Sequence, residues 1–295
     1  MVRHLRLLMV ILAFCVSCAT QPFDVETPEI TIPKPVVKPT APVMTGSSFG
    51  RKLLGASEQR REELILEQFR AGNIPEFLRH FSKVRFISQT RSGKKAEVTL
   101  FVLSDYLSVG TNSDYLRMPM TPLTAQAIAD QYGLLLPTVK IVDAIYRAAS
   151  VKLDPRPFKP GPQMVSVAEL VRHNAVVQSA IRTPVPSGLV AGHKKDIVIT
   201  NLLLRKPNRV AIYGWHLRSG TAIQPLTTVH GSWYADYSHG ARLISGTMVI
   251  NDKAYKVSDV LRDPELSALI SYEGPMKTLR YQIEGQKRTK WWPQS

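Results

Sequence analysis

The second half of the chain contains the sequence HGSWYADYSHGARLI at residues 230–244, the end of a longer stretch, Val190 to Ile244, around which the chain is organised. The longer stretch carries four of the seven histidines of the chain, at positions 193, 216, 230 and 239. Segments rich in β-branched and aromatic residues alternate there with glycine-containing turns, which is typical of strands. We therefore expect a strand-rich half that also holds any chemistry.

Six strands are expected in this half, and the fourth and fifth form a hairpin around Asn251-Asp252. They cover residues 197–200, 210–216, 233–239, 247–250, 254–257 and 281–283. Strand alternation over 233–239 would place Asp236 and Ser238 on one face and His239 on the other.

The first half is dominated by helix signals. Ser57, Thr121 and Ser166 are candidate N-caps, Pro122 follows Thr121 at the first helical position, and Gly133 is the matching stop. A hairpin is expected from strands at 84–88 and 97–103. The predicted fold class is α+β, with a helix-rich first half (50–187) packed on a mostly antiparallel β-sheet in the second half (188–295).

The first 18 residues have the composition of a secretory signal peptide. Arg3 and Arg6 precede an apolar run, Leu7 to Phe14, that is too short to cross a bilayer as a mature helix. The run ends in Cys15-Val16-Ser17-Cys18, which resembles the lipobox of bacterial lipoproteins, with Cys15 where that family usually has leucine. The resemblance implies an exported, membrane-anchored lipoprotein with its lipid on Cys18. Ala19 in place of aspartate implies the periplasmic face of the outer membrane or the cell surface.

Residues 19–49 are expected to be a linker, because they contain six prolines and almost no helix-forming pattern. An extended proline-rich segment rises about 3.1 Å per residue. Such a tether would hold the folded part well away from a membrane.

Cysteine usage and charge restrict the chemistry. Cys15 and Cys18 are the only two cysteines, so a mature chain that begins at Cys18 has no disulfide, no cysteine metal ligand and no cysteine nucleophile in its fold. The formal charge is +15, of which Arg3 and Arg6 supply two. For an exported protein this charge favours an anionic envelope polymer such as peptidoglycan over nucleic acid, although a merely solvated basic surface remains an alternative.

One hypothesis for the site is a metal centre. His193, Asp196, His230 and His239 are the candidate ligands, and zinc is the ion that imidazoles and a carboxylate would hold while an open position activates water. The spacing contains no HExxH or comparable motif, and histidines are also common in hydrogen-bond networks at strand ends.

A second hypothesis uses side chains alone. Ser238 would be the nucleophile, with His230 or His193 as base and Asp236 or Asp196 to orient it. The predicted catalytic set is His230, Asp236, Ser238 and His239. The residues expected to contact substrate are Lys194, Lys195, Trp215, Tyr237 and Arg242, where the two lysines would bind a carboxylate or phosphate or else form a solvated turn.

His230-Gly231 followed by Ser238-His239-Gly240-Ala241-Arg242 resembles the L,D-transpeptidase family, whose hallmark is His-Gly and then Ser-His-Gly-Cys-x-Arg. The resemblance covers some fourteen residues. Ala241 stands where the family has its catalytic cysteine, so cysteine transpeptidation is excluded. The resemblance implies a peptide-binding cleft near His230, Ser238 and His239.

These observations lead to two hypotheses. The first is a lipid-anchored envelope hydrolase that acts on a cell-wall peptide, amide or glycan through a His/Asp-rich site. The alternative is a non-catalytic envelope lipoprotein that binds peptidoglycan, glycan or a protein partner.

Overall fold

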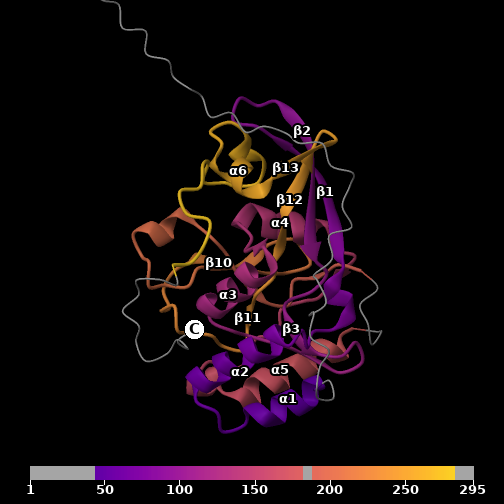
Figure 1. Ribbon diagram of the computed structural model, residues 1–295, viewed down its shortest axis with the longest axis vertical. Helices are drawn as coiled ribbons and strands as arrows, with labels where there is room; N and C mark the ends of the chain where they lie inside the picture. Colours follow the sequence, from indigo (N-terminus) through magenta and orange to yellow (C-terminus); the bar gives the residue numbers. More distant parts are fainter. Residues whose placement is uncertain (1–43, 182–187, 283–295) are drawn as a thin grey trace, which may run out of the picture.

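The computed structural model describes residues 44–181 and 188–282, drawn as ribbon in Figure 1. The predicted signal peptide, Cys18 and most of the 19–49 linker lie outside the described residues. The first helix, α1 (Gly46–Leu53), begins inside the predicted linker, with Thr45 as its N-cap. Among the described residues, no helix is both long enough and apolar enough to span a bilayer.

The fold is mixed α+β, with 33% helix and 26% strand. Besides α1, the α-helices are α2 (Glu58–Arg70), α3 (Pro122–Tyr132), α4 (Val139–Ala148), α5 (Val167–Ser179) and α6 (Val257–Arg262). Short 3-10 helices are η1 (Glu76–Arg79), η2 (Pro162–Val165), η3 (Asn201–Leu204) and η4 (Leu266–Leu269). The strands are β1 (Phe81–Gln89), β2 (Lys95–Leu103), β3 (Ser108–Gly110), β4 (Tyr115–Arg117), β5 (Leu134–Leu135), β6 (Val151–Lys152), β7 (Val190–Ala191), β8 (Lys195–Ile197), β9 (Ile212–His216), β10 (Ala222–Thr227), β11 (His239–Gly240), β12 (Ile244–Ile250) and β13 (Lys253–Lys256).

The predicted helix starts are confirmed by their capping geometry. Ser57, Thr121 and Ser166 each accept a hydrogen bond from the backbone N–H three residues later. Gly133 closes α3 in the left-handed conformation, with φ of 66°.

The larger sheet shows that the predicted arrangement, helices first and sheet second, is wrong. Its order is β1-β2-β12-β13, with β5 also paired to β12. The β1–β2 hairpin of the first half is extended by β12 of the second half, for example where Met248 pairs with Leu100. Helices and strands are therefore interleaved along the whole chain. The predicted β12–β13 hairpin is confirmed, and Asn251 and Asp252 both have positive φ in its turn.

The smaller sheet has the order β10-β9-β8-β11 and includes a parallel pair, β8 with β11. The strand predicted at 233–239 is wrong. The Asp236 carboxylate accepts hydrogen bonds from the Ser238 amide (2.8 Å) and hydroxyl (2.6 Å), which folds these residues into a turn. Asp236 and Ser238 therefore meet through a turn, not through strand alternation.

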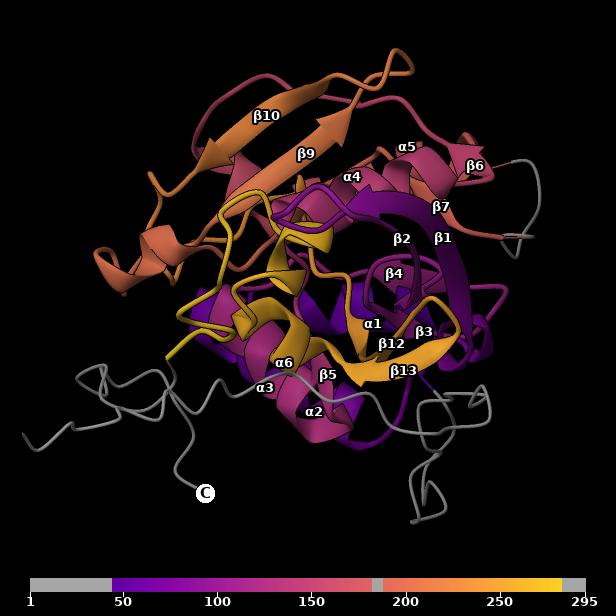
Figure 2. The ribbon, with the colours of Figure 1, turned by 90° about the horizontal axis from the view of Figure 1, so that it is seen from above.

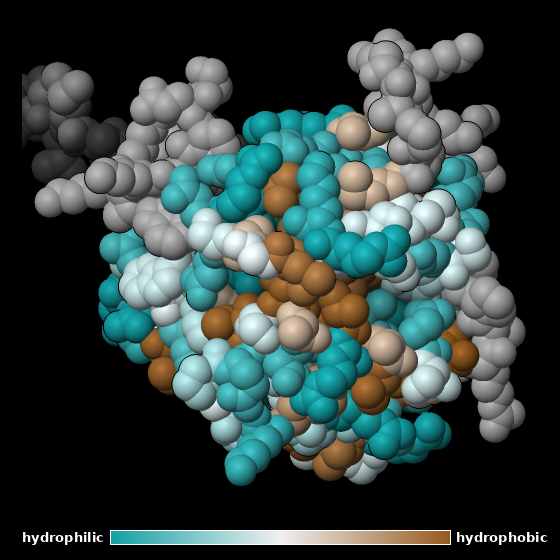
Figure 3. All heavy atoms as spheres, turned by 90° about the horizontal axis from the view of Figure 1, so that it is seen from below, coloured by the Kyte–Doolittle hydropathy of each residue, from teal (hydrophilic) through white to brown (hydrophobic). Residues whose placement is uncertain are grey.

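The two sheets lie on opposite sides of α4, as Figure 2 shows from above. This helix contacts both β9 and β1. Its buried side chains, such as Ile141 and Ile145, belong to a hydrophobic core that draws residues from both halves of the chain. The helices α1, α2 and α5 lie at the lower end of the molecule in Figure 1. Seen from below, apolar atoms gather in the middle of that face (Figure 3).

Candidate functional site

The smaller sheet brings together the histidine clusters that are far apart in sequence. In the parallel pair β8–β11, His239 lies opposite Lys195 and Gly240 opposite Asp196. The Lys195 amide donates to the Ser238 carbonyl at 2.8 Å, and β9 pairs with the other side of β8. Residues 193–196 and 236–242 therefore form one compact polar centre.

His239 has an unusual environment in this centre. Its side chain is fully buried, and neither ring nitrogen makes a hydrogen bond within the part of the chain that the structure describes. Burial lowers the pKa of His239 to about 4, although the nearby Asp236 carboxylate opposes this shift. The imidazole is therefore neutral at pH 7.

Two partly exposed residues, Tyr234 and His230, lie next to this histidine. The Tyr234 ring meets His239 edge to face, with centroids 5.6 Å apart, and stacks on His230 at 4.1 Å. The Tyr234 hydroxyl donates to Asp236 Oδ2 at 3.1 Å. One tyrosine thus contacts both predicted catalytic histidines and orients the carboxylate between them.

Among the residues that the structure describes, Ser238 has no histidine partner. Its hydroxyl is fully buried and donates to the Asp236 carboxylate, which is the bond that closes the turn. The arrangement lacks the serine-to-histidine bond of an activated nucleophile, so it gives no support to Ser238 in that role.

His193 lies deeper, against a buried ion pair. Its Nε2 is 3.2 Å from Asp105 Oδ1, and Asp105 Oδ2 is 2.7 Å from the Arg117 guanidinium. Burial would raise the pKa of Asp105, but the charges of Arg117 and His193 outweigh it and hold that pKa well below its usual range. Burial lowers the pKa of His193 to about 4.

Asp196 is hydrogen-bonded to a buried tyrosine, Tyr106. The Tyr106 hydroxyl donates to Asp196 Oδ2 at 2.8 Å, and the Arg242 guanidinium lies over the Tyr106 ring, 4.4 Å from its centroid. Burial raises the pKa of Asp196 to about 6 in spite of the Arg242 charge. Arg242 itself donates to the carbonyls of Leu103 and Val190, so it also holds backbone together.

Lys194 is almost completely buried. Its ammonium lies 3.1 Å from His173 Nδ1 and donates to the Tyr237 carbonyl. Burial, together with the positive charge of Arg117, lowers the pKa of Lys194 to about 7. This lysine therefore titrates near neutral pH, unlike a surface lysine.

His216 belongs to a separate cluster. Its Nε2 is 3.1 Å from Asp143 Oδ1, and its ring stacks on Tyr146 at 4.4 Å. The preceding residue, Trp215, has φ of 56°, a conformation that a bulky side chain rarely adopts. Strain of this kind costs of the order of 1–3 kcal/mol and gathers at functional sites.

Buried polar atoms without a hydrogen-bond partner concentrate around this sheet. Within the described ranges, they include His173 Nε2, His193 Nδ1, both ring nitrogens of His239, the Trp215 indole nitrogen and Arg242 Nε. Buried polar groups are nearly always paired, so this concentration marks the centre as more than a packed core.

The four candidate metal ligands do not come together as one ligand set. His193 faces Asp105, Asp196 faces Tyr106, and His230 and His239 flank Tyr234. Among the residues that the structure describes, no group of three or more histidine, cysteine, aspartate or glutamate side chains is placed to hold a metal ion. The arrangement gives no support to the zinc hypothesis.

Of the residues expected to contact substrate, Lys194, Trp215, Tyr237 and Arg242 are buried, and only Lys195 is partly exposed. The Lys195 ammonium lies over the Trp215 ring, 4.9 Å from its centroid. Of these five residues, Lys195 is therefore the one that a substrate could contact without a rearrangement of the protein.

Sequence reasoning missed the first-half partners of the centre, namely Asp105, Tyr106, Arg117 and His173. They reach it from β2–β4 and α5 through long-range packing, which leaves no local motif. Tyr234 was also missed as a partner of both histidines, although it lies between them in the sequence.

Comparison with known proteins finds no matching family model, and no curated protein or solved structure has significant similarity to this chain.

Proposed function

We propose that the chain is an exported cell-envelope hydrolase that cleaves an amide bond of the cell wall, with His239 as the group that moves the proton. One observation carries this proposal. The His239 imidazole is buried and neutral beside the Asp236 carboxylate, and both of its ring nitrogens lack a hydrogen bond within the described residues. Perturbed pKa values clustered with unpaired polar atoms are typical of catalytic sites.

The reaction follows from the charges around this histidine. Neutral His239 removes a proton from water as the oxygen attacks the carbonyl carbon, and the Asp236 carboxylate stabilises the resulting imidazolium. The Lys195 ammonium, whose charge acts on both groups, stabilises the negative oxygen that forms. His239 then returns the proton to the departing nitrogen as the C–N bond breaks.

Substrate reaches this centre at the stacked His230–Tyr234 pair. Both side chains are partly exposed, whereas His239 behind Tyr234 is fully buried. The Tyr234 hydroxyl donates to Asp236 Oδ2, so the role of Tyr234 is to position this carboxylate at the partly exposed edge of the site.

A non-catalytic envelope binding protein is the second candidate, and the complete burial of His193, Ser238 and His239 favours it. In that case the polar centre is a structural network, and the partly exposed rim alone meets a partner. Turnover by the purified protein separates the two.

The decisive experiment incubates the purified full chain with cell-wall fragments and measures newly released amino groups. His239→Gln is expected to lower the rate about 10²–10⁴-fold, the usual contribution of acid–base catalysis, with an unchanged unfolding midpoint. His80→Gln is the matched control, because His80 is exposed at the junction between η1 and β1 and is not part of the polar centre. Absence of any release by the wild-type chain across peptide and amide substrates would leave the binding protein as the function.

The location is part of the same proposal and rests on the sequence of residues 1–18. Cys18→Ala is expected to move the protein from the membrane fraction to the soluble fraction, whereas Cys15→Ala is not. Equal membrane association of all three proteins would refute a lipid on Cys18.

A further inference from the structure

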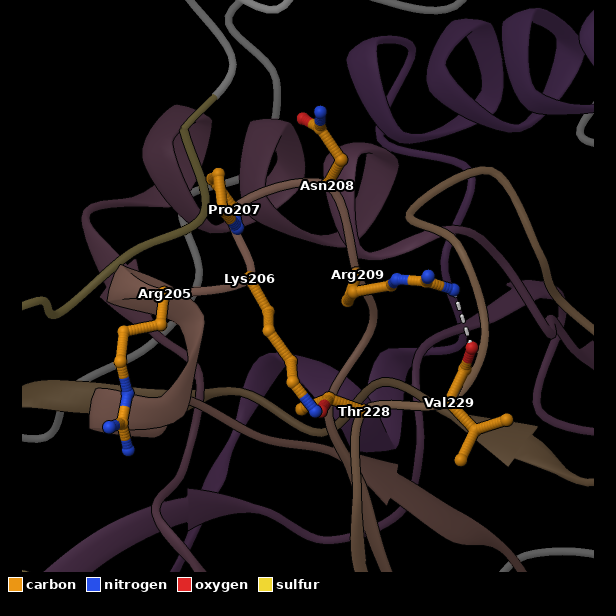
Figure 4. Close-up of a pocket in the computed structure, with 7 residues that line it drawn as sticks. All are labelled: Arg205, Lys206, Pro207, Asn208, Arg209, Thr228 and Val229. Atoms are coloured by element: carbon orange, nitrogen blue, oxygen red, sulfur yellow. Dashed lines mark hydrogen bonds between the residues drawn. The ribbon is translucent and has the colours of Figure 1, made fainter.

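A basic hollow of about 470 Å³ lies next to the candidate site, between the loop that follows η3 and the segment that follows β10 (Figure 4). Arg205, Lys206 and Arg209 line one side of it, and Thr228 and Val229 line the other. No acidic side chain is among the described residues that line it. We propose that this hollow is a subsite for an oxyanion, a phosphate or carboxylate group carried by the substrate.

The hydrogen bonds of the hollow leave its positive charge uncompensated. Lys206 Nζ donates to the Thr228 hydroxyl at 3.2 Å, and Arg209 Nη1 donates to the Val229 carbonyl at 2.6 Å. Figure 4 shows both side chains extending from the loop toward these neutral acceptors. The bonds fix the direction of two cationic groups without neutralising them, so each keeps donors for an anion.

The chemistry of the three groups selects the ligand. A guanidinium presents paired donors that match the oxygens of a phosphate or carboxylate, and the ammonium adds a point charge. Three cations in one hollow of a chain with a net charge of +15 therefore favour an anionic polymer segment over a neutral one.

Backbone pairing connects this subsite to the catalytic centre. The Val210 amide donates to the His230 carbonyl at 3.1 Å, and the Ser232 amide donates to the Asn208 carbonyl at 3.0 Å. Arg209 and Gly231 form a β-bridge between the same two segments. Val229, which lines the hollow, immediately precedes His230, whose ring stacks on Tyr234. An anion held in the hollow therefore places the adjoining part of its chain at the His230–Tyr234 pair.

The role of this subsite in substrate binding rests on the proposed function, but its affinity for anions can be measured separately. The experiment is titration calorimetry of the full chain with inorganic tripolyphosphate and, in parallel, with tricarballylate at an ionic strength of about 0.1 M, where exposed charges more than about 10 Å apart are largely screened. The triple variant R205Q/K206Q/R209Q is expected to bind about tenfold or more weakly, because it removes the three cationic donors of the hollow.

The matched control removes the same charge elsewhere. R85Q/K94Q/K95Q neutralises three exposed cations of the β1–β2 hairpin, and its affinity is expected to stay within about twofold of wild type, since distant charges are screened. Stronger binding of tripolyphosphate identifies a phosphate source, and stronger binding of tricarballylate identifies a carboxylate source. Equal weakening in both triple variants, or no binding of either anion by wild type, overturns the subsite.

His239→Gln separates this inference from the proposed function. It is expected to lose turnover and to bind both anions as wild type does. If the anions bind at the hollow while wild type shows no turnover, the subsite stands and the hydrolase does not. If turnover depends on His239 while R205Q/K206Q/R209Q binds anions normally, the hydrolase stands and the subsite falls.

Discussion

Asp105 and Arg117 form an ion pair, with Oδ2 and Nη2 2.7 Å apart, in which neither side chain is exposed to solvent. The guanidinium also receives support from neutral partners, Gln178 and the Tyr115 hydroxyl. His193 lies against the other oxygen of the same carboxylate. The polar centre therefore rests on a buried ion pair, contacted through His193, whose two residues both come from the first half of the chain.

Asp105→Asn is expected to destabilise the protein by about 3–5 kcal/mol, because it leaves the Arg117 charge buried without its counterion. Urea unfolding measures the loss. Asp130→Asn is the control, since the Asp130–Arg280 pair has exposed side chains (40% and 53%) and should contribute less than about 1 kcal/mol. Similar losses of unfolding free energy in the two variants would mean that the buried ion pair stabilises the protein no more than the exposed one does.

Stability is expected to fall as the pH is lowered from about 6.5 to 4. Burial lowers the folded-state pKa of His193 and His239 to about 4, so the unfolded chain binds protons first in this range and gains free energy relative to the folded chain. The contribution of each neutral histidine to stability is fully present above its unfolded-state pKa of about 6.5 and is lost as the pH falls toward its folded-state pKa of about 4. Each histidine contributes up to about 3 kcal/mol to the change. Asp196 offsets part of it, because burial raises its folded-state pKa to about 6 and the folded chain therefore binds that proton first.

The measurement compares urea midpoints at pH 7.0, 5.5 and 4.5. His239→Gln cannot titrate, so its stability should depend less steeply on pH than that of wild type. A slope unaltered by His239→Gln would contradict a depressed pKa at this residue.

At Gly240 the packing of the polar centre leaves no room for a side chain. A Cβ atom there would lie 2.6 Å from the Tyr106 ring and 2.9 Å from Lys194 Cβ, so Gly240→Ala must displace one of them. We expect a loss of about 1–3 kcal/mol, the usual cost of overpacking. Gly246→Ala is the control, because its Cβ would meet only the Gly133 carbonyl oxygen, at an ordinary 3.4 Å. Gly240→Ala with the stability of Gly246→Ala would show that this packing is loose.

Local signals in the sequence predict local structure well here. Ser57, Thr121 and Ser166 begin helices as expected, because capping depends on atoms within three residues. The β12–β13 turn follows for the same reason. The pairing of β12 with β2 could not be predicted, because no local feature of Met248 specifies Leu100 as its partner.

The candidate site divides in the same way. Clustered histidines and glycines indicated where the centre lies, since β8 and β11 bring residues 193–196 and 236–242 together, whereas His216 of β9 belongs to a separate cluster. The alternation rule failed at Asp236 and Ser238, because a carboxylate that bonds the backbone two residues on folds the segment into a turn despite its aromatic residues. The basic hollow had a visible signal, Arg205-Lys206-Pro207-Asn208-Arg209, but only the fold places it beside His230.

Tyr234 gives the sharpest activity prediction. Tyr234→Phe keeps the ring that stacks on His230 but removes the hydroxyl that donates to Asp236 Oδ2 at 3.1 Å. We expect kcat to fall about tenfold with little change in KM, since one hydrogen bond to a charged group contributes about 1.5–3 kcal/mol. The acidic limb of the pH–rate profile should also move, because the loss of this donor changes the charge that Asp236 presents to His239.

Tyr272→Phe is the matched control for this prediction. It removes a tyrosine hydroxyl that donates to a different carboxylate, Asp143, at 2.9 Å, outside the His239 centre. Its rate and pH profile should match those of wild type. If the two variants lose activity equally, or if Tyr234→Phe lowers stability without moving the pH profile, then Tyr234 is only a packing residue. In that case the link from His230 to Asp236 has no part in the reaction.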